Sequence, residues 1–140
     1  MELVLRRLLV AGAGFLGLTA VPGGVTLLLG IYSPPIDTLQ GSLFSSFTIP
    51  GVALSVGVGG SALLAMVLLL RRHRLGPPSA AIAGLVIMTF EFVQVVSSGS
   101  PPGPSRVMQV LYFSVGLLLA VMAAVAMLIE IDARSSASRH

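Results

Sequence analysis

Four long apolar segments constrain the fold of this chain more than any other feature. They lie at residues 8–31, 50–70, 79–96 and 107–131. A helix needs about 20 consecutive apolar residues to cross a bilayer, and each segment is close to that length. Only 9% of the residues are charged, against about 25% in a typical soluble domain. The sequence therefore predicts an all-α protein, a four-helix up-and-down transmembrane bundle at residues 1–131, followed by a polar cytoplasmic tail without regular structure at 132–140.

The distribution of arginine predicts how this bundle is oriented. Seven of the eight basic residues, all arginines, lie before the first segment, between the second and third, or after the fourth. The eighth, Arg106, precedes the fourth segment. Because arginines concentrate in the cytoplasmic loops of membrane proteins, both termini are predicted to be cytoplasmic and the loops at 32–49 and 97–106 to lie outside. The same argument assigns the net charge of +3 to the flanks of membrane segments, so no nucleic-acid partner is expected.

Proline and glycine predict an irregularity in the first segment, at Pro22, Gly23 and Gly24. Proline removes a backbone hydrogen-bond donor and clashes with the preceding turn, so a kinked or interrupted helix is expected. Such a break is either a packing feature covered by neighbouring helices or part of a substrate site. The residues alone leave both alternatives open.

The connection that follows is predicted to lie at the bilayer surface. Residues 36–44 combine Asp37, as a helix cap, with apolar side chains at helical spacing, which is typical of a short interfacial helix. Tyr32 has an amphipathic ring suited to the level of the lipid headgroups.

A single ionisable residue, Glu91, lies well inside an apolar segment. A charged side chain at the centre of a bilayer costs about 2.5–3.5 kcal/mol on insertion scales, so it normally has a partner or a function. Gln94 shares the helix face of Glu91. Arg106, Gln109 and Tyr112 follow at three-residue spacing on the fourth segment, which runs antiparallel to the third because the loop between them is short. We expect these five residues to converge at the outer mouth of the bundle.

Three interpretations of this cluster are open. In the first, Glu91 pairs with Arg106, or bonds Gln109 and Tyr112, and so locks two helices together. In the second, Glu91 lines a pocket for a lipid, a quinone or another small ligand. In the third, Glu91 carries protons in a transporter. The chain has no cysteine and no metal-ligand spacing, and its segments contain no histidine and no second carboxylate near Glu91, so no catalytic residue, metal or cofactor is predicted.

Short motifs in all four segments form one ordered pattern. They are Val21–Gly24, Phe47–Gly51, Phe90–Gln94, and Gln109–Phe113 with Gly116. The pattern resembles a family of small, uncharacterised four-span inner-membrane proteins of the actinobacterial type, and more loosely the DoxX-like membrane proteins. This resemblance implies a multi-pass protein of the bacterial inner membrane and assigns no activity.

These observations together favour a non-enzymatic helper or subunit with a polar cluster around Glu91. The alternative is a small transporter, or a membrane protein that binds a lipid-like or quinone-like ligand through Glu91. The expected partners are the lipid bilayer and, through small residues spaced four apart on the second and fourth segments, a second copy of the chain or another membrane protein.

Overall fold

The computed structural model describes residues 1–31, 45–100 and 102–139, and all regular structure in these ranges is helical. The predicted interfacial segment at 36–44, with Tyr32 and Asp37, lies outside this description. Four helical stretches are long and apolar enough to cross a membrane, and the second of them consists of three consecutive pieces. In chain order the elements are α1 (Leu3–Leu28), α2 (Thr48–Val52), the π-helix η2 (Ala53–Gly60), α3 (Ser61–Leu70), α4 (Gly76–Ser98) and α5 (Pro104–Ala137).

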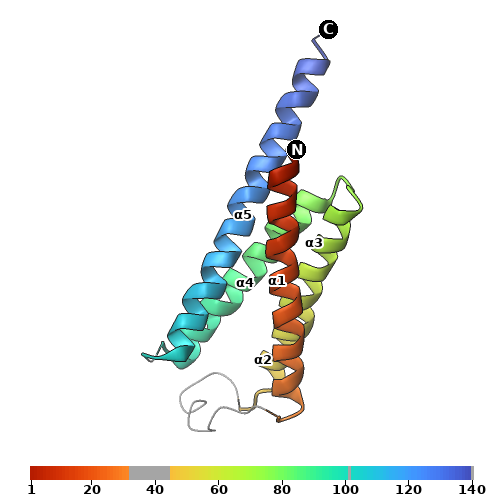
Figure 1. The fold of residues 1–140 in the computed structure, drawn as a ribbon. Coiled ribbons are helices and arrows are strands. Elements are labelled where there is room, and N and C mark those ends of the chain that lie inside the picture. The colour runs from red at the N-terminus through yellow and green to blue at the C-terminus, as the bar shows by residue number, and fades with distance from the viewer. Residues whose placement is uncertain (32–44, 101, 140) are drawn as a thin grey trace.

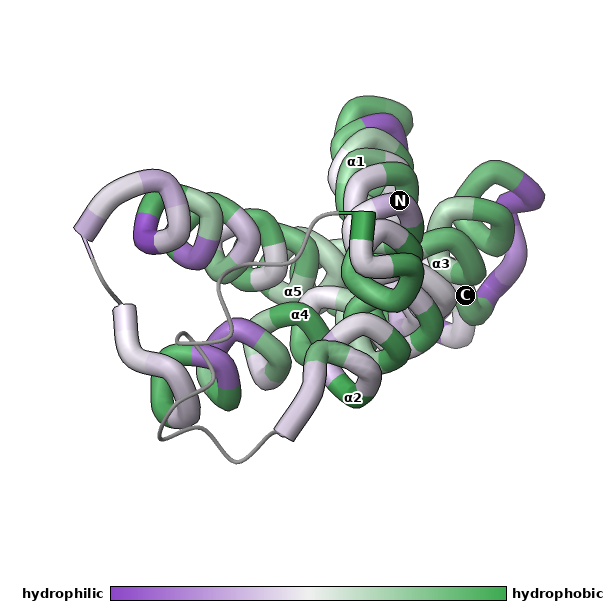
Figure 2. Tube along the Cα trace, turned by 90° about the horizontal axis from the view of Figure 1, so that it is seen from below, coloured by the Kyte–Doolittle hydropathy of each residue, from purple (hydrophilic) through white to green (hydrophobic). Residues whose placement is uncertain are grey.

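The predicted four-helix bundle is confirmed, and its helices run alternately up and down (Figure 1). Both chain termini lie at one end of the molecule, which we call the terminal end, and the C-terminal part of α5 projects beyond the other helices there (Figure 1). We call the opposite end the loop end. Hydrophobic residues cover the bodies of the helices and hydrophilic residues lie mostly near their ends (Figure 2). Such a distribution is what a bilayer requires of helices that cross it.

The core of the bundle is made mainly of small side chains. More than half of its buried hydrophobic residues are alanines, including Ala13, Ala62, Ala83 and Ala123. Large side chains such as Phe92 are exposed on the outside. Lipid tails are as apolar as leucine, so helices in a membrane associate through close packing rather than through burial of large apolar side chains. The core is therefore built on short distances between backbones.

Two pairs of helices come into backbone contact at glycines. A Cβ atom added to Gly84 on α4 would lie 2.5 Å from the carbonyl oxygen of Gly116 on α5. A Cβ atom added to Gly24 on α1 would lie 2.5 Å from the backbone nitrogen of Ser55 in η2. Because both distances are far below ordinary contact, only glycine fits at these positions. The contacts fix the register of α4 against α5 and of α1 against the second span.

Helix α1 continues through Pro22, Gly23 and Gly24, so of the two expected outcomes the interruption is wrong, and the kink stays a prediction. Proline removes only its own backbone hydrogen bond, and the packing of Gly24 against the second span covers the affected turn. The irregular backbone lies instead in the facing segment, where the eight residues of η2 form a π-helix. π-Helical turns are rare and are often found at functional sites.

The C-terminal residues are also more ordered than the sequence indicates. Helix α5 continues to Ala137, so the prediction of a tail without regular structure at 132–140 is wrong for residues up to that point. The hydroxyls of Ser135 and Ser136 donate to carbonyls one turn earlier, at 3.1 and 3.0 Å. Arg134 in the last turn complements the negative end of the helix dipole. Polar residues with such local partners can extend a helix that begins in the membrane.

Replacing Gly84 tests the backbone contact between α4 and α5. The added Cβ of Gly84→Ala would meet backbone atoms, which cannot rotate away as a side chain can, so we expect the free energy of unfolding to fall by about 1–3 kcal/mol. Gly57→Ala is the matched control, because nothing lies within 4 Å of a Cβ atom added to Gly57. Thermal unfolding in a mild detergent measures both variants. Equal Tm values for Gly84→Ala and the unmodified chain would contradict the contact.

Candidate functional site

Glu91 lies on the buried face of α4. The buried residues of this helix include Ala80, Gly84 and Ile87, which recur every three or four residues. Glu91 continues this series one turn nearer the loop end, and only 6% of its surface is exposed. The helical period therefore places a carboxyl group on a face that is otherwise made of small and aliphatic residues.

The register of the two helices places Glu91 opposite the beginning of α5. Gly84 and Gly116 are in contact at the middle of the α4–α5 seam. Glu91 lies seven residues from Gly84 toward the loop end, and Gln109 lies seven residues from Gly116 in the same direction. Seven residues of helix are about two turns, or 10 Å. Two turns return each residue to nearly the same face as its glycine. Glu91 and Gln109 thus share one level of the seam between the antiparallel helices.

Two side-chain oxygens at this level lack a hydrogen-bond donor. Glu91 Oε2 and Gln109 Oε1 are buried and have no partner within the described structure. Ser55, which like Glu91 is a buried polar residue, differs in this respect because its hydroxyl donates to the Gly51 carbonyl at 2.8 Å. A buried acceptor without a donor costs about 1–3 kcal/mol, and more when it is charged. We call Glu91 Oε2 and Gln109 Oε1 the acceptor pair.

Arg106 does not supply the missing donor. Its guanidinium donates to the Ser100 carbonyl, through Nε at 3.1 Å and also through Nη2. The expected pairing of Arg106 with Glu91 is not formed among the described residues. The physical reason is position, because Arg106 is exposed in the first turn of α5 and its long side chain reaches back to the connecting loop.

The remaining residues of the predicted cluster have separate environments. The ring of Tyr112 stacks on Phe15 of α1, with 6.1 Å between ring centroids and 25° between planes, and so joins α5 to α1. Gln94 lines a hollow of about 290 Å³ between α4 and the second span. Gln109 donates from Nε2 to the Gly99 carbonyl at 3.5 Å. What remains of the predicted convergence of five residues is the shared level of Glu91 and Gln109 along the seam, and their contact stays a prediction.

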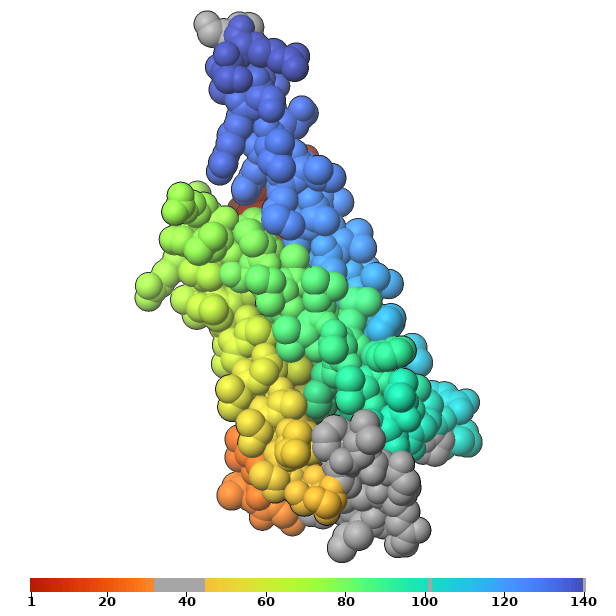
Figure 3. Space-filling view, turned by 180° about the vertical axis from the view of Figure 1, so that it is seen from behind, coloured from red at the N-terminus to blue at the C-terminus, as the bar shows by residue number. Residues whose placement is uncertain are grey.

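The hollow beside α4 is a feature that the sequence analysis missed. Pro50, Ala53 and Gly57 line it from the second span, and Phe90 and Gln94 are among the residues that line it from α4. These elements lie side by side on the face shown in Figure 3. The hollow forms where the second span is π-helical and where Gly57 contributes no side chain. The concentration of glycine in η2 is the one sequence signal that could have indicated it.

Comparison with family models, with curated proteins and with solved structures found no match for this chain. The family resemblance described above therefore stays a prediction. In the ranges that the structure describes, no three acidic or histidine side chains form a group that could hold a metal ion. The chemistry available at the site is the acceptance of hydrogen bonds by the acceptor pair, next to a hollow that can receive apolar groups.

A double-mutant cycle distinguishes the two possible partners of Glu91. We expect the stability effects of Glu91→Gln and Arg106→Gln to add within about 0.5 kcal/mol, because these side chains have no shared contact. Glu91→Gln and Gln109→Leu are expected to show a larger coupling, since both residues lie at one level of the seam. Unfolding of the purified protein in detergent provides the four free energies of each cycle. A coupling of more than about 1 kcal/mol between positions 91 and 106 would instead support an ion pair between Glu91 and Arg106.

Proposed function

We propose that this integral membrane protein binds a small membrane-soluble molecule that carries a hydrogen-bond donor or a cationic group. Glu91 and Gln109 receive that group, and the role is binding or carriage rather than catalysis. The observation that supports this proposal most is the acceptor pair, two buried oxygens from neighbouring helices without a donor in the described structure.

The chemistry of the acceptor pair limits the class of ligand. An ionised carboxylate and an amide oxygen both accept hydrogen bonds, so the group between them has to donate. A quinol hydroxyl or an ammonium group on an apolar body meets this requirement and partitions into the bilayer. Away from water such hydrogen bonds are strengthened, whereas an anionic or purely accepting group would be repelled. The ligand is therefore a donor with an apolar body.

The hollow beside α4 supports an apolar body of limited size. Phe90 and Gln94 belong to the same turns of α4 as Glu91 and lie on an adjacent face. The volume of about 290 Å³ is close to the lower limit of ligand pockets, about 300 Å³, and suits an alkyl or short prenyl segment. Gln94 adds a polar group to this otherwise apolar surface.

Proton carriage by Glu91 is the competing use of the same residues. A protonated Glu91 could itself donate to Gln109 Oε1, so a proton is the smallest donor that satisfies the pair. In that case no larger ligand is needed, and a transporter function follows. The two uses differ in whether a donor ligand stabilises the protein.

A helper or subunit role is the second candidate. It is favoured by the second span, where a Cβ atom added to Gly57 or Gly60 would meet nothing within 4 Å. Small residues on an open helix face let a helix from another protein approach closely. In this role the second span provides the docking surface, and Glu91 contributes to contacts between helices within the bundle.

Matched pairs of ligands test the proposed binding. Decylubiquinol and decylubiquinone share one apolar body, but only the quinol donates; dodecylammonium and dodecanoate likewise differ in the sign of their charge. We expect the quinol or the ammonium compound to raise the Tm of the detergent-purified protein by several degrees near saturation, and the other member of each pair to have little effect. Glu91→Gln should abolish the response to the ammonium compound, because it removes the anionic acceptor.

Glu2→Gln is the control for this experiment, since it makes the same chemical change at an exposed position. Equal responses of the Glu91→Gln and Glu2→Gln proteins would overturn the proposal. A protein whose Tm responds to no donor compound, but whose Glu91→Gln variant no longer moves protons in sealed vesicles, would establish proton carriage instead. If the protein is purified together with another membrane protein in a fixed ratio, and the Gly57→Leu variant is purified without it, the helper role would be supported.

A further inference from the structure

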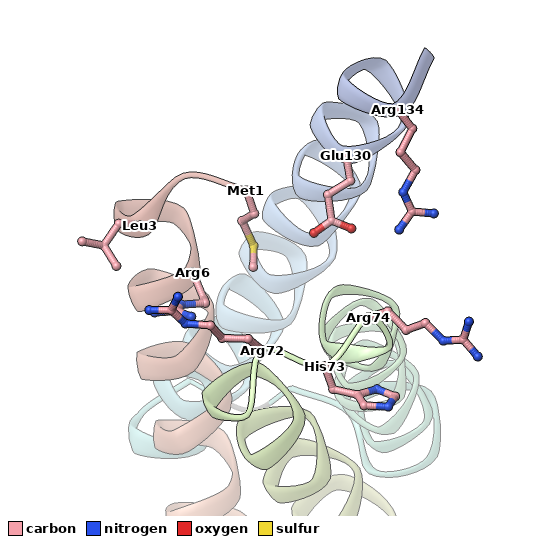
Figure 4. A pocket seen from close by; sticks show the side chains of 8 residues that line it. All are labelled: Met1, Leu3, Arg6, Arg72, His73, Arg74, Glu130 and Arg134. Atoms are coloured by element: carbon pink, nitrogen blue, oxygen red, sulfur yellow. The ribbon is translucent and has the colours of Figure 1, made fainter. Parts of the chain in front are cut away.

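Arginines from three parts of the chain lie at the terminal end. They surround a hollow of about 440 Å³, which is within the size range of ligand pockets. Figure 4 shows Arg6 of α1 and Arg72 on one side of this hollow, and Arg74 and Arg134 on the other. His73 lies between them. We call this hollow the arginine pocket and define it by Arg6, Arg72, His73, Arg74, Glu130 and Arg134.

The arginine pocket carries a large excess of positive charge. Four arginines stand against one carboxylate, that of Glu130, which leaves three positive charges when His73 is neutral. Arginine stays protonated at all physiological pH values, so these charges cannot be relieved by loss of a proton. Arg72, Arg74 and Arg134 are exposed to water, which weakens their mutual repulsion, so the excess charge attracts an anion without requiring one. The charge therefore indicates an anionic ligand.

The backbone at Arg72 indicates that this side chain has a specific role. Helix α3 ends in a motif in which Arg72 N–H donates to the Leu69 carbonyl at 3.2 Å and His73 N–H donates to the Leu68 carbonyl at 2.9 Å. The motif requires a left-handed residue after the helix, a position that glycine normally occupies. Arg72 adopts it with φ of 53°, and within the described ranges it is the one residue other than glycine with positive φ. An arginine thus occupies a position where glycine would be less strained.

His73 presents a hydrogen-bond donor. Its Nδ1 accepts a hydrogen bond from the backbone N–H of Leu75 at 3.2 Å. In the neutral ring the proton is then on Nε2, which becomes a donor. The histidine therefore adds a donor between the arginines without requiring a charge of its own.

We propose that the arginine pocket binds a phosphate group, either the headgroup phosphate of an anionic phospholipid or that of a small phosphorylated anion. The planar fork of arginine matches phosphate oxygens in a bidentate way. The pocket lies at the ends of membrane-spanning helices, where α1 begins and α3 ends, and this is the level of lipid headgroups. This site is separate from the acceptor pair, which lies toward the loop end.

Orientation of the protein in the membrane is the simpler role for these arginines. That role depends on the number of positive charges beside a span and does not depend on where each side chain points. Arg71 provides the contrast, because it belongs to the same loop and has the same charge but does not line the pocket. A binding site therefore predicts different effects at positions 71 and 72, whereas an orienting charge predicts equal ones.

Lipid binding to the purified protein in neutral detergent tests the proposal, with native mass spectrometry as the readout. Phosphatidylglycerol is compared with zwitterionic phosphatidylcholine, and we expect a clear preference for phosphatidylglycerol. Arg72→Gly and Arg74→Gln should each weaken this binding roughly tenfold, as expected for loss of a charge-assisted hydrogen bond. Arg71→Gln and Arg106→Gln are the controls, because neither arginine lines the pocket, and they should leave binding within about twofold. Equal losses from Arg71→Gln and Arg72→Gly, or no preference for phosphatidylglycerol, would overturn the proposal.

Arg72→Gly also separates binding from stability. Glycine suits the left-handed position, so this variant should have a Tm equal to or higher than that of the unmodified protein when no anionic lipid is present. Weaker lipid binding by a protein that is not destabilised cannot result from misfolding. If Arg72→Gly retains full binding, the pocket does not use this arginine and the proposal fails.

The source of the phosphate is identified in the same assay. Glycerol 1-phosphate and inorganic phosphate, at millimolar concentration, are added as competitors of phosphatidylglycerol. If neither compound displaces phosphatidylglycerol, the pocket binds the headgroup of a lipid, and the acyl chains of that lipid add to the affinity. If one of these compounds displaces phosphatidylglycerol from the unmodified protein but not from Arg74→Gln, the pocket binds a small phosphorylated anion. Binding of none of these compounds to the unmodified protein would overturn the proposal.

Discussion

The structure depends on backbone contact between α4 and α5 at Gly84 and Gly116. In a bilayer there is little gain from burying large apolar side chains between helices, so close approach of small residues has to hold the bundle together. At this contact a single added methyl group would lie 2.5 Å from a carbonyl oxygen. A contact this close allows only one register. The level at which Glu91 meets α5 is set by that register and not by any polar interaction of Glu91 itself.

The two polar sites differ in what they lack. At the acceptor pair, Glu91 and Gln109 offer oxygens without a donor in the described structure, and the hollow beside Gln94 is lined mainly by apolar groups. At the arginine pocket, donors and positive charge are in excess over the one carboxylate of Glu130. The first site therefore suits a cation or a donor and the second an anion. The two proposed sites therefore have opposite chemistry and lie toward the two ends of the bundle.

The order of the elements could be predicted from the sequence because it depends on local properties. Apolar length defines the four spans, and prolines and glycines mark the connections. The expectation that Glu91 faces the fourth segment rested on the same helical period, which places Glu91 on the buried face of α4 with Gly84 and Ile87. These inferences required no knowledge of how the helices pack.

The details that were wrong or missing depend on packing. Pro22 appeared to break α1, but a neighbouring span covers the affected turn, and the irregular turns are those of η2. One of the open interpretations paired Arg106 with Glu91 on spacing alone, but the side chain of Arg106 is long enough to reach Ser100 instead. The arginine pocket combines residues from α1, the connection between α3 and α4, and a continuation of α5 that was expected to lack structure. Sequence spacing within one helix carries no information about such combinations.

Cross-linking of introduced cysteines in native membranes measures the register of the α4–α5 seam most directly. The chain has no cysteine of its own, so each pair reports one distance without background. We expect Glu91→Cys with Gln109→Cys to form an intramolecular disulfide on mild oxidation, detected by mass spectrometry after digestion. Phe92→Cys with Gln109→Cys should not form one, because Phe92 is exposed on the outer surface. If the cysteine at position 109 forms a disulfide with the one at 92 more readily than with the one at 91, Glu91 and Gln109 do not share one level of the seam. That result would also contradict the proposed binding of a ligand between them.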